Sequence, residues 1–375
     1  MTAPRFSAAD HRWMARALRL AERGAGSTRP NPMVGCVLVR DGAVVGEGWH
    51  QRKGGPHAEV FALRAAGDRA HGATAYVTLE PCAHFGRTPP CADALAAAGV
   101  ARVVGAMRDP FPQVDGAGFD RLRAAGIEVD SGLMEAQARA LNAGFLSRIE
   151  RGRPWVRIKL AASLDGRTAM ADGDSRWITG EAARADVQRW RARASAILTG
   201  AGTVLADDPH LTVRLGEGAE VLPPLRVVLD ARLSTLARAK VRSADAPTLY
   251  LHAPGAEPPP GLDIDHAAVP LAADGRLDLH AVLRCLGERE INEVHVEAGA
   301  TLCGALLREG LADELLLYTA PLLLGDGARP LLAGLGIGRM AERIALETLD
   351  LRMLGRDLRW RLRPVRDRDE QESLK

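Results

Sequence analysis

Hydrophobic and polar residues recur with two different periods at the start of the chain. Apolar residues at helical spacing predict a helix over residues 8–23, and Ser7 followed by Asp10 is typical of the capping box that begins a helix. The stretch MVGCVLVRDGAVVGEGWH holds two β-rich runs around Asp41-Gly42, a dipeptide that supplies the positive φ angles of a tight hairpin. The pattern therefore predicts a helix followed by a β-hairpin.

Helical and extended patterns then alternate along the rest of the chain. In the first half they predict helices over 58–66, 91–98, 118–125 and 133–143, and strands over 74–79, 102–107 and 127–130. In the second half they predict helices over 180–193, 279–288 and 300–309, strands over 155–163, 195–200, 225–230, 247–252, 293–297 and 313–319, and a terminal β-pair around LRMLGRDLRWRL. Such alternation is typical of an α/β sheet covered on both faces.

The chain length and a break in the pattern predict two α/β domains. At roughly 150 residues per domain, 375 residues correspond to about two. We expect a first domain over 1–147, a polar linker over 148–154 that ends Gly-x-Pro, and a second domain over 155–365. Residues 366–375 form a charged tail that cannot bury enough apolar surface to become ordered.

Composition narrows the class of protein. Hydrophobic residues make up 47% and charged residues 26%, and no apolar run reaches the roughly 18 residues of a membrane span. The N-terminus lacks the charged start and apolar stretch of a secretory signal, so we expect a cytoplasmic protein with no membrane partner. A net charge of +2 does not favour nucleic acid as a partner. Five cysteines suit free thiols in a reducing compartment, where they are available to bind metal.

Two stretches combine residues that are typical of a catalytic zinc site. His57 and Glu59 open HAEVFALRAAG, and Cys82 and Cys91 lie in TLEPCAHFGRTPPC. One imidazole and two thiolates leave a fourth position of zinc open for water, and in zinc deaminases with H-x-E and P-C-x-x-C motifs the glutamate shuttles protons without binding the metal. Zinc lowers the pKa of bound water from 15.7 to about 7, which makes a nucleophile available at neutral pH.

The predicted elements favour convergence of these residues. Pro81 ends a strand just before Cys82, and Pro90 is suited to the first turn of the helix that Cys91 begins. His57 and Glu59 fall in the first turn of another helix. A structural zinc site and a chance grouping of inert residues stay open as alternatives, as does His84 as a rival ligand.

The first half also resembles a known family. Eight residues separate Cys82 from Cys91, where the general signature has two. PCAHFGRTPPC, NPMVGCV and GWHQRKGGPHAEV instead resemble the riboflavin-biosynthesis pyrimidine deaminases, which form the N-terminal half of the bifunctional deaminase-reductase family RibD. The resemblance implies a cytidine-deaminase-like three-layer α/β/α domain, Zn²⁺, and a diaminopyrimidinone substrate with a phosphoribosylamino group. It places Asn31, His50, His84 and Arg87 near that substrate.

In the second half, glycines follow predicted strands at two places. TGAGTVLADDP and VEAGATLCGALL each put glycine between a strand and a helix, where backbone N–H groups are able to bind phosphate. From the residues alone, ordinary structural turns remain an equal alternative.

A second resemblance addresses that choice. KLAASLDGRTA, SRWITG, ILTGAGTVLADDPHLTVR and VEAGATLCGALL resemble the reductase half of the same family, a dihydrofolate-reductase-like α/β domain that uses NADPH to reduce the ribosyl group to ribityl. By that resemblance the residues at NADPH are Ala161, Trp177, Thr203, Asp207, Ser234, Gly299, Ala300, Thr301, Leu302, Cys303 and Gly304. Those at the substrate are Ser175, Arg191, Leu211, Arg214 and Glu297.

The matched positions suggest individual roles. Arg191 and Arg214 are expected at the substrate phosphate, because a planar guanidinium fits that anion. Lys159 and Asp165 are candidates for proton transfer or imine orientation, with a structural ion pair as the alternative. We expect a small phosphorylated pyrimidine as partner and, by family analogy, a homo-oligomer.

Two other classes of function share some of these sequence features. A nucleic-acid deaminase shares the zinc chemistry, but the long cysteine spacing, the near-neutral charge and only 4% aromatic residues for stacking bases argue against it. A structural zinc with a nucleotide-sensing second domain leaves Glu59 unexplained. The choice between NADPH and NADH is not fixed by the residues themselves.

Overall fold

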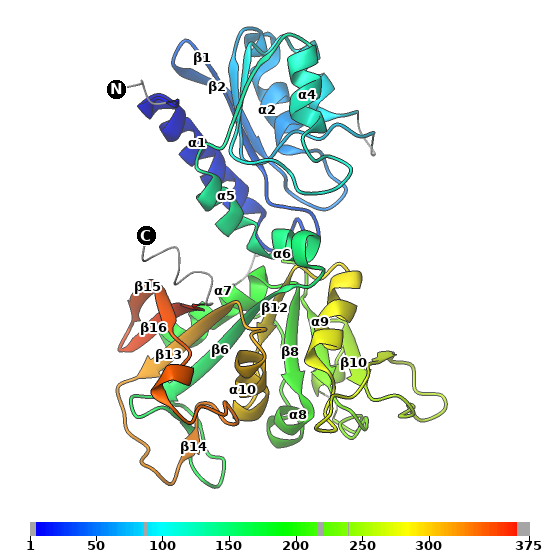
Figure 1. The fold of residues 1–375 in the computed structure, drawn as a ribbon, viewed down its shortest axis with the longest axis vertical. Coiled ribbons are helices and arrows are strands. Elements are labelled where there is room, and N and C mark those ends of the chain that lie inside the picture. The colour runs from blue at the N-terminus through cyan, green and yellow to red at the C-terminus, as the bar shows by residue number, and fades with distance from the viewer. Residues whose placement is uncertain (1–4, 86–88, 217–220, 239, 366–375) are drawn as a thin grey trace. The chain divides into compact units, whose positions relative to one another are not determined.

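The computed structural model describes residues 5–85, 89–216, 221–238 and 240–365, in which the chain forms two compact units (Figure 1). The division falls between Gly152 and Arg153. The tail expected over 366–375 lies outside the described residues, as does Arg87.

The first unit is built on a five-stranded sheet of order β2-β1-β3-β4-β5 within the described residues. β1 pairs antiparallel with β2 and β3, and β3, β4 and β5 run parallel. Its elements are α1 (Ala8–Ala21), η1 (Glu22–Gly24), β1 (Gly35–Arg40), β2 (Ala43–Trp49), α2 (Ala58–Ala66), η2 (Gly67–Ala70), β3 (Thr74–Val77), α3 (Cys91–Ala97), β4 (Arg102–Gly105), α4 (Ala117–Ala124), β5 (Glu128–Ser131), α5 (Glu135–Leu141) and α6 (Ala143–Arg151).

Helices cover both faces of this sheet because its strands alternate apolar side chains to either side. Val37 and Val39 of β1 pack in one cluster with α1, α5 and α6. Cys36 and Leu38, on the opposite face of the same strand, pack in a second cluster with α2, α3 and α4. The three-layer α/β/α arrangement expected for the first domain is therefore confirmed.

The segment expected to link the domains is partly helical, which corrects the prediction of a linker over 148–154. α6 continues to Arg151 and ends at Gly152, whose φ of 66° suits a left-handed helix cap. Phe145 and Leu146 are buried in the core and Ile149 packs against it. Ser147 is also buried, whereas Glu150 and Arg151 are exposed, and this polar end of the helix resembled a linker in the sequence.

The second unit is built on a nine-stranded mixed sheet of order β11-β10-β9-β8-β12-β6-β13-β16-β15 within the described residues. Strands β11 to β13 of this order run parallel, and β13, β16 and β15 are antiparallel. The elements are β6 (Trp155–Ser163), β7 (Arg167–Ala169), α7 (Glu181–Arg193), β8 (Ala196–Gly200), α8 (Ala201–Asp207), β9 (Leu225–Leu229), η3 (Lys240–Arg242), β10 (Thr248–His252), β11 (Asp265–Ala268), α9 (Leu279–Glu288), β12 (Glu293–Val296), α10 (Ala300–Arg308), β13 (Glu314–Ala320), β14 (Arg329–Pro330), η4 (Met340–Glu342), β15 (Leu346–Leu354) and β16 (Asp357–Pro364).

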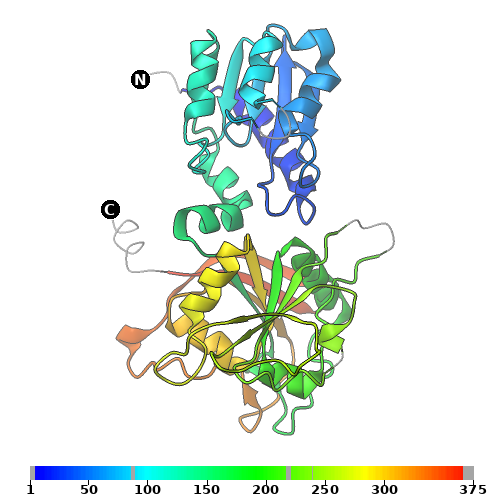
Figure 2. The same cartoon turned by 90° about the vertical axis from the view of Figure 1, so that its right-hand side faces the viewer.

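The two faces of this sheet differ in chemistry. Val156, Ile158 and Leu160 of β6 pack with α9 and α10 in the large apolar cluster. Arg157, on the opposite face, lies 4.5 Å from the ring centroid of Trp190 in α7. Figure 2 shows the yellow α9 and the green α7 on opposite sides of the strands. The face toward α7 therefore carries the charged side chain of Arg157 beside an apolar cluster that includes Trp190, Leu316 and Tyr318.

Some elements were not predicted. The pattern gave only a glycine turn where α8 forms, and it did not indicate β7, β11 or β14. These elements have seven residues or fewer, too few for a period to stand out. The other predicted helices and strands are present within a few residues of their expected ends.

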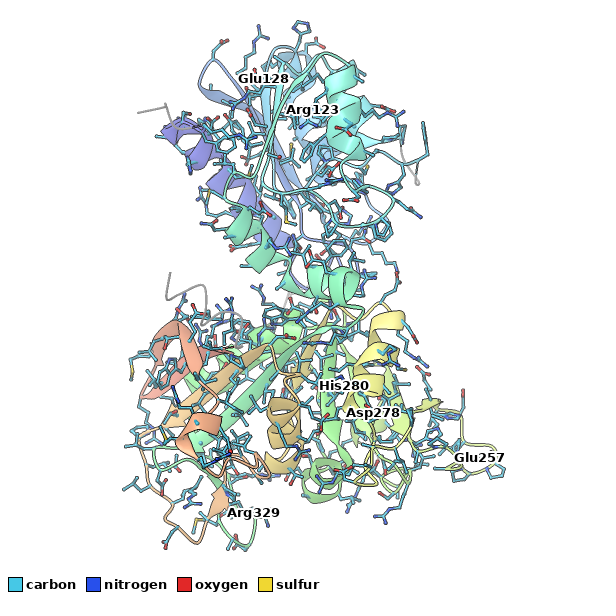
Figure 3. All side chains as sticks on the ribbon, viewed as in Figure 1. Arg123, Glu128, Glu257, Asp278, His280 and Arg329 are labelled. Atoms are coloured by element: carbon cyan, nitrogen blue, oxygen red, sulfur yellow. The ribbon has the colours of Figure 1, made fainter. Side chains whose placement is uncertain are left out.

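Local signals explain the start of α9. Asp278 is its N-cap, and its carboxylate accepts hydrogen bonds from the backbone N–H of His280 at 2.9 Å and of Ala281 at 3.2 Å. Asp278 and His280 are labelled in Figure 3.

Among the described helices, α9 included, we find none whose length and hydropathy suit a bilayer crossing.

Candidate active sites

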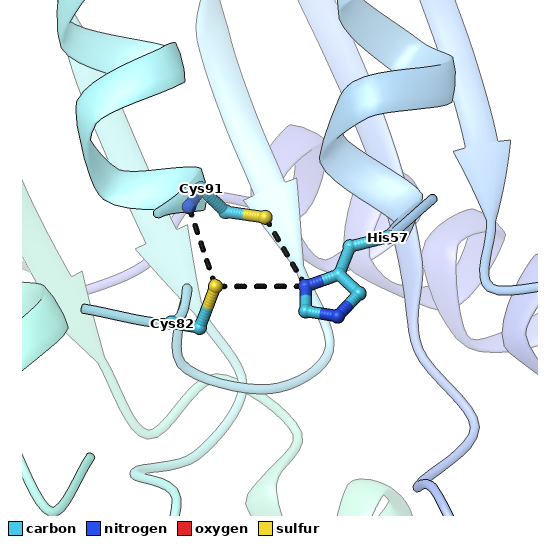
Figure 4. A group of neighbouring side chains, drawn as sticks. All are labelled: His57, Cys82 and Cys91. Atoms are coloured by element: carbon cyan, nitrogen blue, oxygen red, sulfur yellow. Dashed lines mark hydrogen bonds between the residues drawn. The ribbon is translucent and has the colours of Figure 1, made fainter. Parts of the chain in front are cut away.

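Three elements of the first unit bring one histidine and two cysteines together (Figure 4). His57 is the N-cap of α2, Cys91 is the first residue of α3, and Cys82 lies in the loop after β3. The Nδ1 atom of His57 lies 3.5 Å from Cys82 Sγ and 3.3 Å from Cys91 Sγ. The three donor atoms all lie within 4.8 Å of one another.

This donor set fits zinc. Bond lengths of about 2.3 Å to sulfur and 2.0–2.1 Å to nitrogen place tetrahedral ligand atoms about 3.5 Å apart, which matches the two S···N distances. The pKa of Cys82 is lowered to about 4, because Cys91 and His57 donate hydrogen bonds to its sulfur. Within the described residues His84 is not part of this group, so the structure does not support it as a rival ligand.

Glu59 lies beside the three donors in the first turn of α2. Its side chain is buried, and its Oε2 atom has no hydrogen-bond partner among the described residues. Burial raises the pKa of the Glu59 carboxyl. A buried carboxylate oxygen without a partner is costly, which indicates that the site is built to receive a ligand there.

Two residues expected at the substrate lie next to His57. His50 Nδ1 donates to Pro56 O at 3.0 Å, so its Nε2 is free to accept a hydrogen bond from Asn31 Nδ2, also at 3.0 Å. The His50 and His57 rings meet edge to face with centroids 5.6 Å apart. The structure thus brings Asn31 and His50 next to His57.

Of the other two expected substrate residues, only His84 is described. It follows Cys82 by two positions, and its Nδ1 atom is buried without a hydrogen-bond partner among the described residues. Arg87 lies outside the described residues.

Asn142, which the sequence did not single out, fixes the loop that carries Asn31. The Met33 N–H donates to Asn142 Oδ1 at 2.8 Å, and Asn142 Nδ2 donates to Met33 O at 2.9 Å. Asn142 is buried between α5 and α6. The two residues are 109 positions apart, so no local sequence signal connects them.

A second group of polar side chains lies on the α7 face of the second unit. The Arg191 guanidinium binds both oxygens of the Glu297 carboxylate, with Nε–Oε1 at 2.5 Å and Nη2–Oε2 at 2.9 Å, and its Nη1 donates to Thr212 O. The guanidinium that we expected at a phosphate is thus directed to Glu297 and the backbone.

Lys159 of β6 lies beside this pair. Ile158 is the register partner of Val296. The next residue of each segment, Lys159 and Glu297, therefore lies beside the other on one face of the sheet. Although burial opposes ionisation, Arg191 and Lys159 hold the pKa of Glu297 well below its usual range. Burial lowers the pKa of Lys159.

Several positions expected at NADPH follow the ends of β8 and β12, whereas Ala161 lies within β6. Gly200 is the N-cap of α8, which carries Thr203 and Asp207, and Gly299 is the N-cap of α10. β8 and β12 are neighbours in the parallel part of the sheet, so their carboxyl ends open at one edge. The Thr199 hydroxyl, just before Gly200, is buried without a partner in the described residues.

The other residues expected at the cofactor differ in how far their side chains are exposed to solvent. Trp177 is 68% exposed, with its ring under the Arg184 guanidinium, and Ser234 is exposed in the turn after β9. Cys303 is buried in the core, and a Cβ on Gly304 would lie 1.9 Å from Ala333 O. On the inner side of α10, packing alone accounts for these last two residues.

The remaining expected residues of the second site are only partly brought together. Ser175 and Arg214 are exposed, whereas the Leu211 side chain is buried in an apolar cluster.

Asp165 is exposed in the turn after β6, where its carboxylate accepts hydrogen bonds from the backbone N–H groups of Leu324 and Gly325 and from the Ser163 hydroxyl. These bonds lower the Asp165 pKa to about 2 and give it a loop-holding role.

Comparisons with known proteins match both units. Residues 7–107 match the family described as the cytidine and deoxycytidylate deaminase zinc-binding region, and residues 154–359 match the RibD C-terminal domain family. Riboflavin biosynthesis protein RibD from Escherichia coli strain K12 is 50% identical over 359 residues, covering 93% of this chain and 98% of that protein. The protein of the same name from Aquifex aeolicus strain VF5 is 42% identical over 350 residues, covering 93% and 97%.

Solved structures match over nearly the whole length. Acinetobacter baumannii RibD, form 1, has a TM-score of 0.87 and 46% identity, and the match covers 96% of this chain and 99% of that one. A diaminohydroxyphosphoribosylaminopyrimidine deaminase/5-amino-6-(5-phosphoribosylamino)uracil reductase from Thermotoga maritima has a TM-score of 0.85 and 34% identity, covering 95% and 99%. The expected pair of folds, a deaminase followed by a reductase, is confirmed by these matches.

Proposed function

We propose, from the premise that the chain belongs to the RibD family of riboflavin biosynthesis proteins, that it catalyses two successive reactions on one pyrimidine. It is a zinc-dependent deaminase and an NADPH-dependent reductase. The first reaction removes the 2-amino group of 2,5-diamino-6-(phosphoribosylamino)pyrimidin-4-one by hydrolysis. The second reduces the ribosyl group of the product to ribityl. We assign the deaminase to the unit that ends at Gly152 and the reductase to the unit that begins at Arg153.

The observation that carries the deaminase assignment is the buried Oε2 atom of Glu59, which has no hydrogen-bond partner among the described residues and lies beside three converging donor atoms. His57, Cys82 and Cys91 would hold zinc, which supplies the Lewis acidity that makes water a nucleophile at neutral pH. Glu59 takes the proton that this water loses and delivers it to the departing amino nitrogen, so ammonia leaves and a carbonyl replaces the amidine.

Residues around the cluster bind and orient the pyrimidine in this proposal. Asn31 and His50 form a hydrogen-bonded pair next to His57, with groups suited to the polar edge of a pyrimidine ring. The buried Nδ1 atom of His84 has no hydrogen-bond partner in the part of the chain that the structure describes, and His84 is proposed to contact the same substrate. Arg87 is proposed to bind its phosphate, because a guanidinium can make two parallel bonds to that group.

In the reductase, NADPH would lie at the strand ends that lead to Gly200 and Gly299, and it supplies the hydride that reaches C1′ of the opened sugar. Ala161, Trp177, Thr203, Asp207, Ser234 and residues 299–304 are the proposed cofactor positions. Ser175, Leu211 and Arg214 are the proposed substrate positions, together with the Arg191–Glu297 pair. Arg214 is exposed and better placed than Arg191 for the phosphate, because the Arg191 guanidinium is engaged by Glu297.

We assign proton transfer in the reductase to Lys159. Its ammonium makes no hydrogen bond to a described residue, although it lies beside the Glu297 carboxylate. A lysine whose pKa is lowered by burial gives up a proton more readily, as protonation of the imine nitrogen requires. Asp165 is the weaker candidate because its carboxylate is taken up by loop hydrogen bonds.

We further propose that the enzyme works in the cytoplasm and assembles as a homo-oligomer.

A coupled assay tests the function. The purified enzyme is given the diaminopyrimidinone phosphate with and without NADPH, and ammonia and NADPH are followed. We expect ammonia release without NADPH, and NADPH oxidation only after deamination. NADPH oxidation with no ammonia release would contradict the order of the two reactions.

A further inference from the structure

We infer that Glu80 is a positioning residue for the zinc ligand Cys82, acting through the start of α4. The inference deepens the proposed deaminase function and rests on it. Glu80 and Pro81 directly precede Cys82, and α4 (Ala117–Ala124) supplies none of the three metal ligands. The contacts of α4 nevertheless hold the segment that carries Cys82 on both sides of this ligand.

The Glu80 carboxylate is buried and accepts four backbone hydrogen bonds. Oε2 accepts from the N–H of Asp109 at 3.2 Å and of Gly116 at 3.0 Å. Oε1 accepts from the N–H of Gly118 at 2.8 Å and of Phe119 at 3.3 Å. Each oxygen thus binds two donors, and three of the four donors belong to the N-cap and first turn of α4, where unpaired N–H groups favour an anion.

The backbone around this carboxylate is shaped for close contact. Gly116, the N-cap of α4, has a φ of 94°, a conformation that favours glycine. A Cβ on Gly118 would lie 1.9 Å from Pro81 O, so the start of α4 presses directly on the residue between Glu80 and Cys82. The position of Pro81 is therefore fixed from two directions.

The far side of Cys82 is tied to the same helix. Arg121 of α4 donates from Nη1 to Ala83 O at 2.8 Å, and its Nε lies 2.6 Å from Asp93 Oδ1 in α3. Cys82 itself is joined to α3 by the bond from Ala92 N–H to Cys82 O at 3.2 Å. The bonds of Glu80 and Arg121 therefore flank Cys82 and set its distance from Cys91 and His57.

The substitution Glu80→Gln tests this role with little change in shape. A glutamine side chain has one oxygen and one amide nitrogen, so two of the four backbone N–H groups would face another donor. The segment before Cys82 must shift to relieve this, and the metal geometry must shift with it. We expect a loss of metal affinity of about tenfold, in the range seen when groups that orient ligands are removed.

The experiment measures metal binding apart from turnover. The full-length apo-protein is titrated with Co²⁺, whose visible spectrum reports the ligand geometry, and with Zn²⁺ in competition with a chelator. Glu135→Gln is the matched control, because Glu135 is an exposed glutamate in the first turn of α5. We expect Glu80→Gln to alter the Co²⁺ spectrum and weaken Zn²⁺ binding, with the control and the reductase activity unchanged.

A second, milder variant tests the same role in case Glu80→Gln does not fold. Arg121→Met removes the bond to Ala83 from a half-exposed position, and we expect about a threefold loss of Zn²⁺ affinity. The inference fails if Glu80→Gln lowers only the unfolding temperature while the Co²⁺ spectrum and Zn²⁺ affinity stay as in the wild type. If the wild type itself binds Zn²⁺ but releases no ammonia, the proposed function fails instead.

Discussion

The guanidinium of Arg191 binds the carboxylate of Glu297 through two parallel hydrogen bonds of 2.5 and 2.9 Å across 106 positions of sequence. Both side chains are nearly buried, with 11% and 12% of their surfaces exposed. Two parallel hydrogen bonds fix the orientation of the carboxylate and also pair its negative charge with the guanidinium. Arg191 therefore sets the orientation of Glu297 beside Lys159.

The substitution Arg191→Lys should impair the reductase. Lysine retains the charge but loses the second parallel bond and the bond to Thr212, which leaves buried acceptors poorly paired. We expect kcat/KM for NADPH-dependent reduction to fall by about 10- to 100-fold, which corresponds to roughly 1.4–2.8 kcal/mol. Steady-state kinetics on the deaminated substrate measures this.

Two controls apply to the Arg191→Lys variant. Ammonia release should be unchanged, because Arg191 belongs to the second unit and the zinc ligands to the first. Arg189→Lys, an exposed position on the same helix, should leave both activities unchanged. Equal losses from the two arginine variants would contradict an orienting role for Arg191.

Removal of the metal should separate the two activities. A strong chelator should abolish ammonia release, whereas reduction of the already deaminated substrate should continue, because the proposed hydride transfer needs no zinc. Adding Zn²⁺ back should restore ammonia release. Loss of both activities on chelation, with the second unit still folded by circular dichroism, would argue against two independent sites.

Local signals in the sequence predicted most of the elements and the convergence of His57, Cys82 and Cys91. His57 and Cys91 each begin a helix, and the predicted helix over 58–66 matches α2 (Ala58–Ala66). Because these ligands are placed by helix starts and prolines near them in sequence, their convergence followed from the motifs. α6 was missed because its polar end resembles a linker.

Contacts between distant segments could not be predicted from the sequence. The Asn142–Met33 bonds and the Arg191–Glu297 pair depend on which strands and helices become neighbours in the fold. The four N–H groups around Glu80 likewise converge only once β3, the loop after β4 and α4 are assembled. The expectation that Arg191 faces a phosphate came from side-chain chemistry, which does not reveal a competing carboxylate.

Asp10 should make the first unit sensitive to acid. Its carboxylate accepts hydrogen bonds from Tyr76 at 2.7 Å and from Arg102 at 3.0 Å, and completes the capping box with Ser7. Although burial raises it, these bonds lower the Asp10 pKa from 3.8 to about 2. The pKa is lower in the folded state, so this stabilisation is complete above about pH 4 and is lost as pH falls toward 2.

Thermal unfolding against pH measures this contribution. Asp10→Asn should destabilise the first unit by about 2 kcal/mol near neutral pH, and the difference from wild type should shrink between pH 4 and pH 2. Asp120→Asn is the matched control, since that carboxylate is 77% exposed. A difference that stays constant down to pH 2 would show that the Asp10 charge is not the source of the stability.

In the proposed mechanism, Glu59 moves protons beside a zinc ion that His57, Cys82 and Cys91 would hold. The most direct measurement is the zinc content and the rate of ammonia release of the Glu59→Gln variant. We predict wild-type zinc content, deamination lower by about 10²- to 10⁴-fold, and normal reduction of the deaminated substrate. Near-normal ammonia release, or loss of zinc together with activity, would contradict this role for Glu59.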